Sequence, residues 1–413
     1  MNCINNAKEK LEKYVGRNAI WGWILIDLCI FIIPFFNGIP LLLFMTNKTK
    51  ELIQPFYAYF SLLFLAYNII NGIKKKRIKT VICNLGIAVL VLFCSCFGLI
   101  SFKYLNDVID LFGSISINLI VASFFIPFIL CTGVVEYIAQ KFEKIIKKFF
   151  DLPGEATISV LTGFVSSPSV GIYIAQKFYD TGIYSRKDTI AVMTNFSVVS
   201  IGFMGFMIST AKLDNLYGII LALVFFINLL LAFVLIRIPP ISKIRSTYQA
   251  SQIYEGVDNI TSCKKLKIQE FKNSFIDTLG YLIQMISQIF ISYLLIMILI
   301  DYTDILHIIS IPITYLMNIF KIEDGSFWAQ TLLLGGIDPS FVLVFMARYE
   351  LDYITRFKIV VLAIIQVIFY TEPIIAMRKV SEPIEWKYII KIFIERSILG
   401  VIIIELFCKC ILS

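Results

Sequence analysis

The chain has 413 residues, of which 58% are hydrophobic and 16% charged, and its mean hydropathy is +0.83. A water-soluble domain of this size needs more polar surface, so the composition excludes that class and predicts an all-α polytopic membrane protein in a lipid bilayer. Its 37 basic and 29 acidic residues give a formal charge of +8. The basic residues lie in loops between apolar segments, so we interpret the excess as a topology signal and expect no nucleic-acid partner.

Nine apolar windows are long enough to cross the membrane, since a transmembrane helix needs about 20 residues for roughly 30 Å of hydrocarbon. We therefore expect about nine transmembrane helices. In chain order the windows are Ile20–Phe44, Pro55–Ile73, Val81–Phe102, Leu111–Val135, Thr189–Ser209, Tyr217–Ile236, Phe275–Ile300, Thr355–Met377 and Tyr388–Cys408.

The segment before the first window, Met1–Arg17, is polar and lysine-rich and has no small-residue cleavage site after it. This pattern indicates a retained first span rather than a signal peptide. The nine cysteines lie mainly in apolar windows and include no CxxC pair. We therefore interpret them as small hydrophobic residues of the spans. His307 is the single histidine, and there is no HExxH, GxSxG or P-loop motif. We therefore expect neither an enzyme nor a resident metal or cofactor.

Basic residues cluster in alternate loops and so predict the orientation of the spans. The lysine-rich N-terminal segment, residues 74–79 and the loop Pro239–Asn273 belong in the cytoplasm, as does Glu136–Phe150, which reads as an amphipathic surface helix. The more acidic loops Asn106–Asp110 and Asp301–Asp304 belong outside. Nine crossings from a cytoplasmic N-terminus place the C-terminus outside. The membrane we expect is the bacterial cytoplasmic (inner) membrane.

An internal repeat emerges when the chain is compared with itself at an offset of 171 residues. Pro168-Ser169 then falls on Pro339-Ser340, and Asn195 falls on Gln366. Each copy has a span, a surface helix, a broken stretch and two more spans. Because each copy crosses the membrane an odd number of times, the second copy must be inverted relative to the first, an arrangement common among transporters.

The repeat divides the chain into four parts. They are an N-terminal three-helix scaffold (1–110), a first repeat (111–238), a cytoplasmic linker (239–272) and an inverted second repeat (273–413).

The broken stretches are Thr157–Phe178 and Phe327–Tyr349, and each is interrupted at its centre by proline and polar residues. Each arm of about nine residues reaches only about 13 Å at 1.5 Å per residue, so we predict two re-entrant helical hairpins that dip halfway into the membrane. Irregular backbone at that depth is tolerated only where it is buried in protein or lines a cavity.

Two carboxylates are predicted at membrane depth. Glu372 precedes Pro373 deep in the eighth window, and Asp338 lies at the tip of the second hairpin. A charge at the bilayer centre costs at least about 2.5–3.5 kcal/mol, so both side chains should face a polar interior and could carry a coupling ion. The alternative for Glu372 is an ion pair with Arg378 or Lys379 near the cytoplasmic end.

Polar residues in two further spans permit more limited predictions. Asp277, Gln284 and Gln288 are spaced by seven and four residues and therefore share one helical face. Glu395 and Arg396 in the ninth window are interpreted as an internal ion pair rather than as a substrate site.

Three segments carry a resemblance to a known family: Thr162-Gly163-Phe164-Val165-Ser166-Ser167-Pro168-Ser169-Val170-Gly171, Tyr184-Ser185-Arg186-Lys187 and Asn195-Phe196-Ser197-Val198-Val199-Ser200. They resemble the YjiH-type membrane proteins, which carry the nucleoside-recognition (Gate) domain. Distant similarities extend to concentrative nucleoside transporters, ferrous-iron transporters and spore-maturation membrane proteins. The resemblance covers the first repeat well and the second more loosely.

The resemblance implies that hairpin tips and broken spans line a site for a small solute. Asp338 and Glu372 would then be ion-coupling residues, with Na⁺ or H⁺ as the ion. The implied substrate-binding residues are Ser166, Ser167, Pro168, Ser169, Asn195, Ser197, Ser200, Pro339, Ser340, Gln366 and Thr371.

The leading functional hypothesis is a secondary transporter of a small polar solute, nucleoside-like or amino-acid/peptide-like, with alternating access around the hairpin tips. A non-transporting Gate-domain membrane assembly or sensor protein, like the spore-maturation relatives, is the alternative. A channel is a third reading, and a homo-oligomer is possible in each case.

Overall fold

The computed structural model describes residues 17–31, 39–97, 103–132, 134–248, 268–319 and 324–411, together with residues 33 and 322. The regular structure within these ranges is helical, as the sequence predicts. The predictions on residues 1–16, on linker residues 249–267 and on the last two residues lie outside the described chain.

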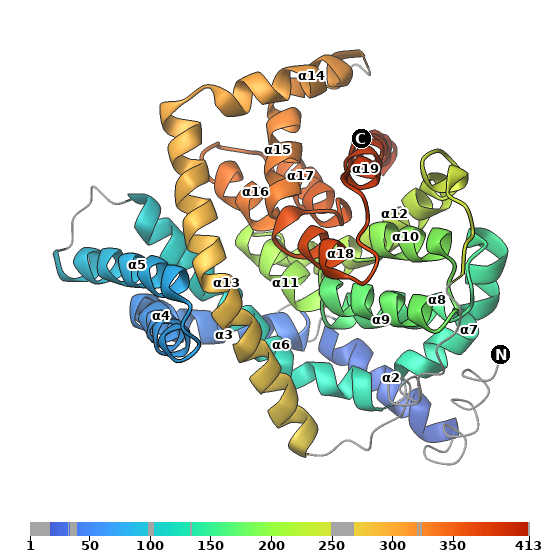
Figure 1. The fold of residues 1–413 in the computed structure, drawn as a ribbon, viewed down its shortest axis with the longest axis horizontal. Coiled ribbons are helices and arrows are strands. Elements are labelled where there is room, and N and C mark those ends of the chain that lie inside the picture. Colours follow the sequence, from blue (N-terminus) through green and yellow to red (C-terminus); the bar gives the residue numbers. More distant parts are fainter. Residues whose placement is uncertain are drawn as a thin grey trace.

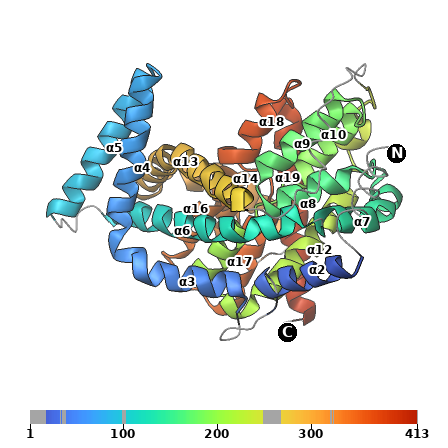
Figure 2. The ribbon, with the colours of Figure 1, turned by 90° about the horizontal axis from the view of Figure 1, so that it is seen from below.

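The N-terminal part contains α2 (Arg17–Phe31), α3 (Leu41–Ile53), η1 (Gln54–Phe56), α4 (Tyr57–Lys74) and α5 (Ile78–Phe97). The prediction that Ile20–Phe44 forms one span is wrong, because Pro40 is extended (φ −64°, ψ 157°) and α3 begins only after it. Proline has no amide hydrogen to continue a helix and is favoured near helix starts. Helices α4 and α5 pack against each other at one edge of the molecule (Figure 2).

The two halves of the predicted repeat contain the same succession of elements. The first half comprises α6 (Lys103–Cys131), α7 (Val134–Phe150), α8 (Ala156–Val165), α9 (Pro168–Asp180), α10 (Arg186–Asn195), α11 (Ile201–Thr210) and α12 (Tyr217–Leu235). The second comprises α13 (Ile268–Tyr302), α14 (Ile305–Ile319), α15 (Gly325–Ile337), α16 (Pro339–Met346), α17 (Tyr353–Ile365), η6 (Tyr370–Ile374), α18 (Ile375–Lys379) and α19 (Trp386–Ile411).

Several of these elements keep the offset without any shift. Helices α7 and α14 begin at residues 134 and 305, and α9 and α16 begin at residues 168 and 339, each pair 171 positions apart. The first arm of each broken stretch packs on its own second arm and on the preceding helix, α8 with α9 and α7, and α15 with α16 and α14.

Contacts between the halves are reciprocal. Helix α9 packs on η6 and α18 of the second half, while its counterpart α16 packs on α11 of the first half. Arg186 donates to the carbonyl oxygen of Glu382 at 2.7 Å, and Arg356 donates to that of Ala211 at 3.3 Å. Glu382 lies 171 residues after Ala211. Such paired contacts are what a two-fold relation produces. In Figure 1, orange and red elements of the second half lie beside green elements of the first half.

Five helical stretches of the described chain are long and apolar enough to cross a membrane: Leu41–Lys74, Tyr104–Phe128, Asp214–Leu235, Ile268–Tyr302 and Tyr353–Lys379. Together with the shorter apolar helices they make this a multi-pass membrane protein. Two predicted windows, Ile20–Phe44 and Thr189–Ser209, are not among these stretches because the helix is interrupted within each of them.

The window Thr189–Ser209 is not a continuous helix, because α10 ends at Asn195 and α11 begins at Ile201. Likewise, α17 ends at Ile365 and helical structure resumes at Tyr370, inside the window Thr355–Met377. Both intervals occupy corresponding positions of the repeat and leave backbone groups unpaired at the helix ends.

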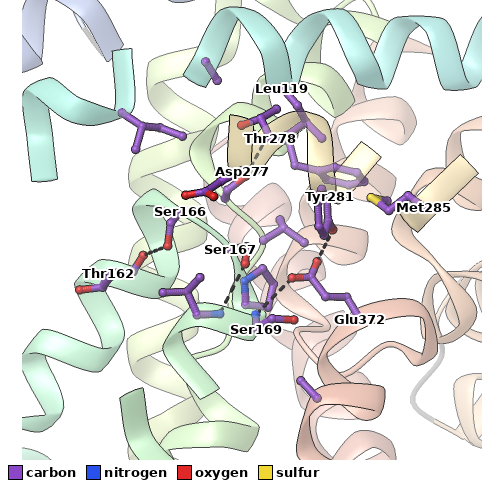
Figure 3. Close-up of a pocket in the computed structure, with 18 of the residues that line it drawn as sticks. Leu119, Thr162, Ser166, Ser167, Ser169, Asp277, Thr278, Tyr281, Met285 and Glu372 are labelled. Carbon is purple, nitrogen blue, oxygen red and sulfur yellow. Dashed lines mark hydrogen bonds between the residues drawn. The ribbon is translucent and has the colours of Figure 1, made fainter. Parts of the chain in front are cut away.

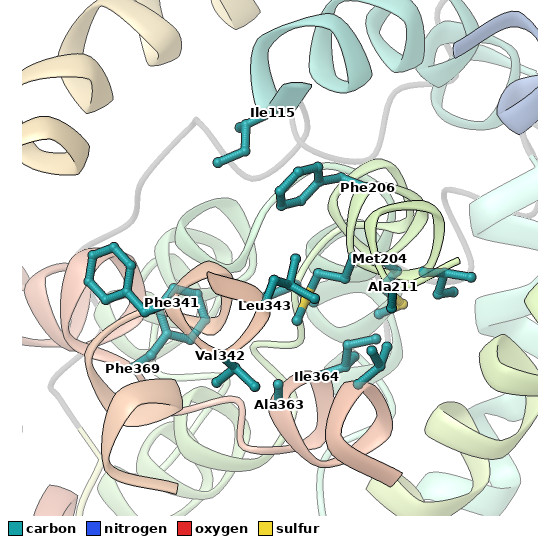
Figure 4. Packing of buried hydrophobic residues seen from close by; sticks show 14 of the residues in the cluster. Ile115, Met204, Phe206, Ala211, Phe341, Val342, Leu343, Ala363, Ile364 and Phe369 are labelled. Carbon is teal, nitrogen blue, oxygen red and sulfur yellow. The ribbon is translucent and has the colours of Figure 1, made fainter. Parts of the chain in front are cut away.

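Part of the main hydrophobic core lies between the two halves. Phe206 and Met204 of α11 face Phe341, Val342 and Leu343 of α16, together with residues of α17 (Figure 4). These side chains are at most 2% exposed. The core therefore holds the second hairpin against the broken span of the first half.

Candidate functional site

A cavity of about 820 Å³ lies where the first hairpin tip, α6, α13 and the broken span of the second half meet (Figure 3). Three helices begin at its wall, since their N-cap residues Ser167, Ser200 and Asp338 all line it. Helix N-termini carry partial positive charge and unpaired amide hydrogens. The cavity wall is therefore supplied with backbone donors as well as hydroxyls.

The first hairpin tip is shaped by its serines and proline. Ser166 donates to the carbonyl oxygen of Thr162 at 2.6 Å and so ties down the end of α8. Ser167 is extended and caps α9, accepting from the Val170 amide at 3.4 Å. Pro168 occupies the first helical position, where its missing amide hydrogen costs nothing. The bend thus leaves Ser169 at the exposed N-terminus of α9.

Glu372 is bound from two directions. Its carboxylate accepts from the backbone amide of Ser169 at 3.2 Å and from the hydroxyl of Tyr281 at 2.7 Å (Figure 3). Ser169 belongs to the first half and Glu372 to the second, so this carboxylate links the two halves across the cavity. A carboxylate at the N-terminus of α9 is favoured by the helix dipole. Arg378 instead donates to the Ile384 carbonyl oxygen, so it is not the partner of Glu372.

Asp338 plays a comparable part at the second hairpin tip. It caps α16 by accepting from the Ser340 amide at 2.8 Å and from the Ser340 hydroxyl at 2.5 Å. Its second oxygen accepts from Thr371 at 2.5 Å. Asp338 therefore joins the hairpin tip to the break that carries Glu372.

The break itself contains a strained residue. Val367 has φ +61°, a conformation that is rare for a β-branched side chain. The Ile368 amide donates to the Gln366 carbonyl oxygen at 2.6 Å, closing a tight turn around Val367. Backbone strain of this kind tends to cluster at switch and ligand-binding regions.

The predicted site residues divide into two groups. Eight line the cavity: Ser166, Ser167, Pro168, Ser169, Ser200, Asp338, Thr371 and Glu372. Five do not line it and are buried behind the hairpin tips and breaks: Asn195, Ser197, Pro339, Ser340 and Gln366.

The residues behind the cavity fix the backbone that forms it. Ser197 donates to the Met193 carbonyl oxygen at 2.7 Å, and Gln366 donates to that of Leu332 at 2.9 Å. Gln366 thereby connects the break of α17 to the first arm of the second hairpin.

Tyr281 and Thr278 are not among the residues that the sequence predicts for the site. Both line the cavity from α13, as do Asp277 and Gln288. Tyr281 follows Asp277 by four residues and precedes Gln288 by seven, so the shared helical face was a usable signal. Tyrosine is common in apolar helices, so its presence alone does not indicate a binding site.

The predicted internal ion pair between Glu395 and Arg396 is wrong. Arg396 bonds to Asn195, Asn228 and the Ile365 carbonyl oxygen, whereas Glu395 lies 3.9 Å from Lys391. Adjacent residues of a helix point about 100° apart, so neighbours in sequence do not face each other.

The charged lining is predominantly acidic. Glu270, Asp277, Asp338 and Glu372 contribute carboxylates, against Lys379 as the one cationic side chain of the lining among the described residues. The described residues contain no group of three His, Cys, Asp or Glu side chains placed to hold a metal. Carboxylates, hydroxyls and amide donors suit a polar solute, and the carboxylates can take up protons or bind a monovalent cation.

Comparison with known proteins agrees with this architecture. Residues 112–214 match a family model described as Gate, nucleoside recognition. This segment includes the first hairpin and the break after α10. An uncharacterized protein of Alkalihalophilus pseudofirmus is 26% identical over 304 residues, a match that covers 68% of this chain and 65%, just under two thirds, of that protein.

Two solved structures of the concentrative nucleoside transporter CNTnw share the fold. The inward-facing substrate-bound state gives a TM-score of 0.52 at 9% identity and covers 95% of this chain and 91% of that one. An outward-facing variant gives 0.50 at 11% identity, with 97% and 94% covered. At 9% and 11% identity these matches show a shared fold. The resemblance read from the sequence is confirmed: residues 112–214 carry a Gate segment within a chain that has a nucleoside-transporter-like fold.

Proposed function

We propose that this protein is a secondary transporter whose solute binds in the cavity between the first hairpin tip and the broken span of the second half. The observation that carries the proposal is the position of Glu372, which bonds to Ser169 of the other half across that cavity. A carboxylate that holds two moving parts together can release them when it is protonated or when a solute replaces one of its donors.

The two halves are proposed to lie inverted in the bacterial cytoplasmic membrane, with the hairpins entering from opposite faces. The 171-residue offset of the elements and the reciprocal arginine contacts support this arrangement. In inverted-repeat transporters the site lies at the repeat interface and is built from discontinuous helices, and the breaks after α10 and α17 fit that description.

The proposed solute is small, polar and nucleoside-like or amino-acid/peptide-like. A volume of about 820 Å³ is within the usual range for small-molecule sites. Hydroxyl and amide donors would recognise oxygen atoms of the solute, while Tyr281, Phe203 and Phe369 offer aromatic faces to a ring. The coupling ion is proposed to act at Glu372 or Asp338.

Solute binding can be screened by thermal unfolding of the purified protein with nucleosides, nucleobases, amino acids and short peptides, since a ligand of the folded state raises its apparent stability. Uptake of the hits into proteoliposomes, with and without sodium or proton gradients, then tests transport. Binding without flux would favour the membrane sensor or assembly instead.

Glu372→Gln and Asp338→Asn test the assigned carboxylates. Charge-assisted hydrogen bonds contribute about 1.5–3 kcal/mol each, so we expect uptake to fall by roughly tenfold or more and to lose its dependence on the ion gradient. Glu51→Gln is the matched control, because Glu51 is exposed and bonds only to Lys48 among described residues. Unchanged uptake and gradient dependence in both test variants would refute the assignment.

A further inference from the structure

The interior between the two halves contains a positive charge that the cavity does not use. Arg396 of α19 is 1% exposed and is the largest of the fully buried side chains. Its Nε donates to the Ile365 carbonyl oxygen at 2.7 Å, and its terminal nitrogens donate to Asn195 Oδ1 at 3.3 Å and to Asn228 Oδ1. No carboxylate of the described chain forms an ion pair with it.

The amide groups around this guanidinium are oriented by bonds to their own helices. Asn195 donates its Nδ2 to the Ala191 carbonyl oxygen at 3.0 Å, and Asn228 donates its Nδ2 to that of Val224 at 2.9 Å. The amide nitrogens are therefore used within their own helices, and the oxygen atoms accept from Arg396. The pocket around the guanidinium consists of acceptors from three helices.

Two of these acceptors lie at helix ends. Asn195 is the last residue of α10, and Ile365 is the last residue of α17. The C-terminus of a helix carries partial negative charge from its unpaired carbonyl groups. Arg396 thus lies where two such ends converge, and Figure 1 shows α10, α12, α17 and α19 on the same side of the molecule.

Each break therefore has a helix N-terminus, with partial positive charge, on its cavity side and a helix C-terminus, with partial negative charge, on the side of Arg396. The segments that follow them bring Ser200 and Thr371 to the cavity, whereas the helices that precede them end at Arg396. Oxygen atoms of amides and carbonyls are the ligands that hard cations prefer, and discontinuous membrane helices use their C-terminal ends to bind Na⁺.

We infer that Arg396 is a built-in cation: its guanidinium fills an oxygen-lined cation position at the junction of the two broken helices, in place of a dissociable ion such as sodium. The planar guanidinium group has enough N–H donors to form hydrogen bonds with all three oxygen atoms at once. Because the charge is covalently attached, the junction stays neutralised in every state, and a coupling ion has to act elsewhere. The inference does not depend on which solute is carried.

Arg396→Ala empties this position without altering the three acceptors. We expect the full-length protein in detergent to unfold at a lower temperature than the wild type, and millimolar guanidinium or sodium ions to restore part of the loss. Tetramethylammonium at the same concentration, which is too large and donates no hydrogen bonds, should restore nothing. The wild type should show no ion-specific gain.

Arg237→Ala is the matched control, since Arg237 also donates to two backbone carbonyl groups, those of Phe233 and Phe149, but at an exposed site. It should show no recovery with either ion. A wild-type-like midpoint in Arg396→Ala, or a loss that neither ion recovers, would overturn the inference.

A second pair of variants decides the case if Arg396→Ala does not accumulate. Arg396→Lys retains a cation, whereas Arg396→Met retains apolar bulk only. A higher unfolding midpoint for the lysine variant supports the built-in cation, and an equal or higher midpoint for the methionine variant refutes it. Both readouts are stabilities, so an absence of solute flux would count against the proposed transport alone.

Discussion

Tyr281 is the residue whose hydroxyl completes the binding of Glu372 at the cavity wall. At the scale of single residues, the site consists of donors arranged around two carboxylates, Glu372 and Asp338, each of which accepts hydrogen bonds from at least two residues. Buried carboxylates are stable only when their lone pairs are satisfied. Removing one donor should therefore have a measurable effect.

Tyr281→Phe removes the hydroxyl donor and retains the ring. Because a hydrogen bond to a charged group contributes about 1.5–3 kcal/mol, we expect a lower unfolding temperature. In a double-mutant cycle with Glu372→Gln, the combined loss should be smaller than the sum of the single losses.

Tyr217→Phe is the control for this substitution. Tyr217 is buried, whereas Tyr281 is partly exposed, and the Tyr217 hydroxyl has no hydrogen-bond partner among the described residues. Its removal should therefore leave stability unchanged or raise it. An additive cycle for Tyr281 and Glu372 would show that their contact contributes nothing.

Residues of the candidate site were predictable from the sequence where burying their side chains in the membrane costs free energy. Asp338 and Glu372 stand out because a carboxylate in an apolar window demands an explanation. The resemblance predicts that Asn195 and Gln366 bind the solute, yet neither lines the cavity, because polarity alone does not tell which side of a helix end a side chain occupies. The acceptors of Arg396 come from positions far apart in the chain, and no local pattern encodes them.

At the scale of elements, the first hairpin depends on a close approach of α8 and α9. A Cβ atom added to Gly171 would lie 3.1 Å from the Gly163 Cα atom and 3.1 Å from the Ser159 carbonyl oxygen. Both obstacles are backbone atoms, which cannot move aside as a side chain can. Small residues at such positions let membrane helices approach closely.

Gly171→Ala should therefore separate the two arms. We expect overpacking to cost about 1–3 kcal/mol, seen as a lower unfolding temperature, and the displaced tip to weaken solute binding. Gly86→Ala in α5 is the control, because no atom lies within 4 Å of its added Cβ, and alanine is the better helix former. Equal stabilities of the two variants would contradict the close packing.

Elements were predictable where a proline or a polar cluster interrupts an apolar window. Pro168 and Pro339 both start helices at the predicted tips. The prediction of one continuous first span was wrong at Pro40. Because Pro40 is flanked by apolar residues, the mean hydropathy of the window stays high across it. The gap after Ile365 includes Val367, whose strained conformation comes from its surroundings rather than from its own preference.

At the scale of the whole molecule, the proposed inversion of the halves has a direct test. Lys144 of α7 and Tyr315 of α14 are 171 residues apart and both exposed. In a background without native cysteines, Lys144→Cys and Tyr315→Cys should react with a membrane-impermeant maleimide from opposite faces, Lys144→Cys from the cytoplasm. Labelling of both from one face would refute the inversion.

The all-helical, multi-pass character was predictable because the composition and the apolar windows both indicate it. The mutual placement of the halves was not, since it depends on packing between residues such as Phe206 and Phe341 that are distant in sequence.

The paired contacts of Arg186 and Arg356 have a consequence for motion. When two similar halves of one chain meet through corresponding hydrogen bonds, a distortion of one half has a counterpart in the other half. The two distortions have nearly the same energy. Giving each half the internal conformation of its counterpart would therefore generate a second, comparably stable shape of the protein. Because the halves are proposed to be inverted, the cavity in that shape would face the opposite side of the membrane, without unfolding either half.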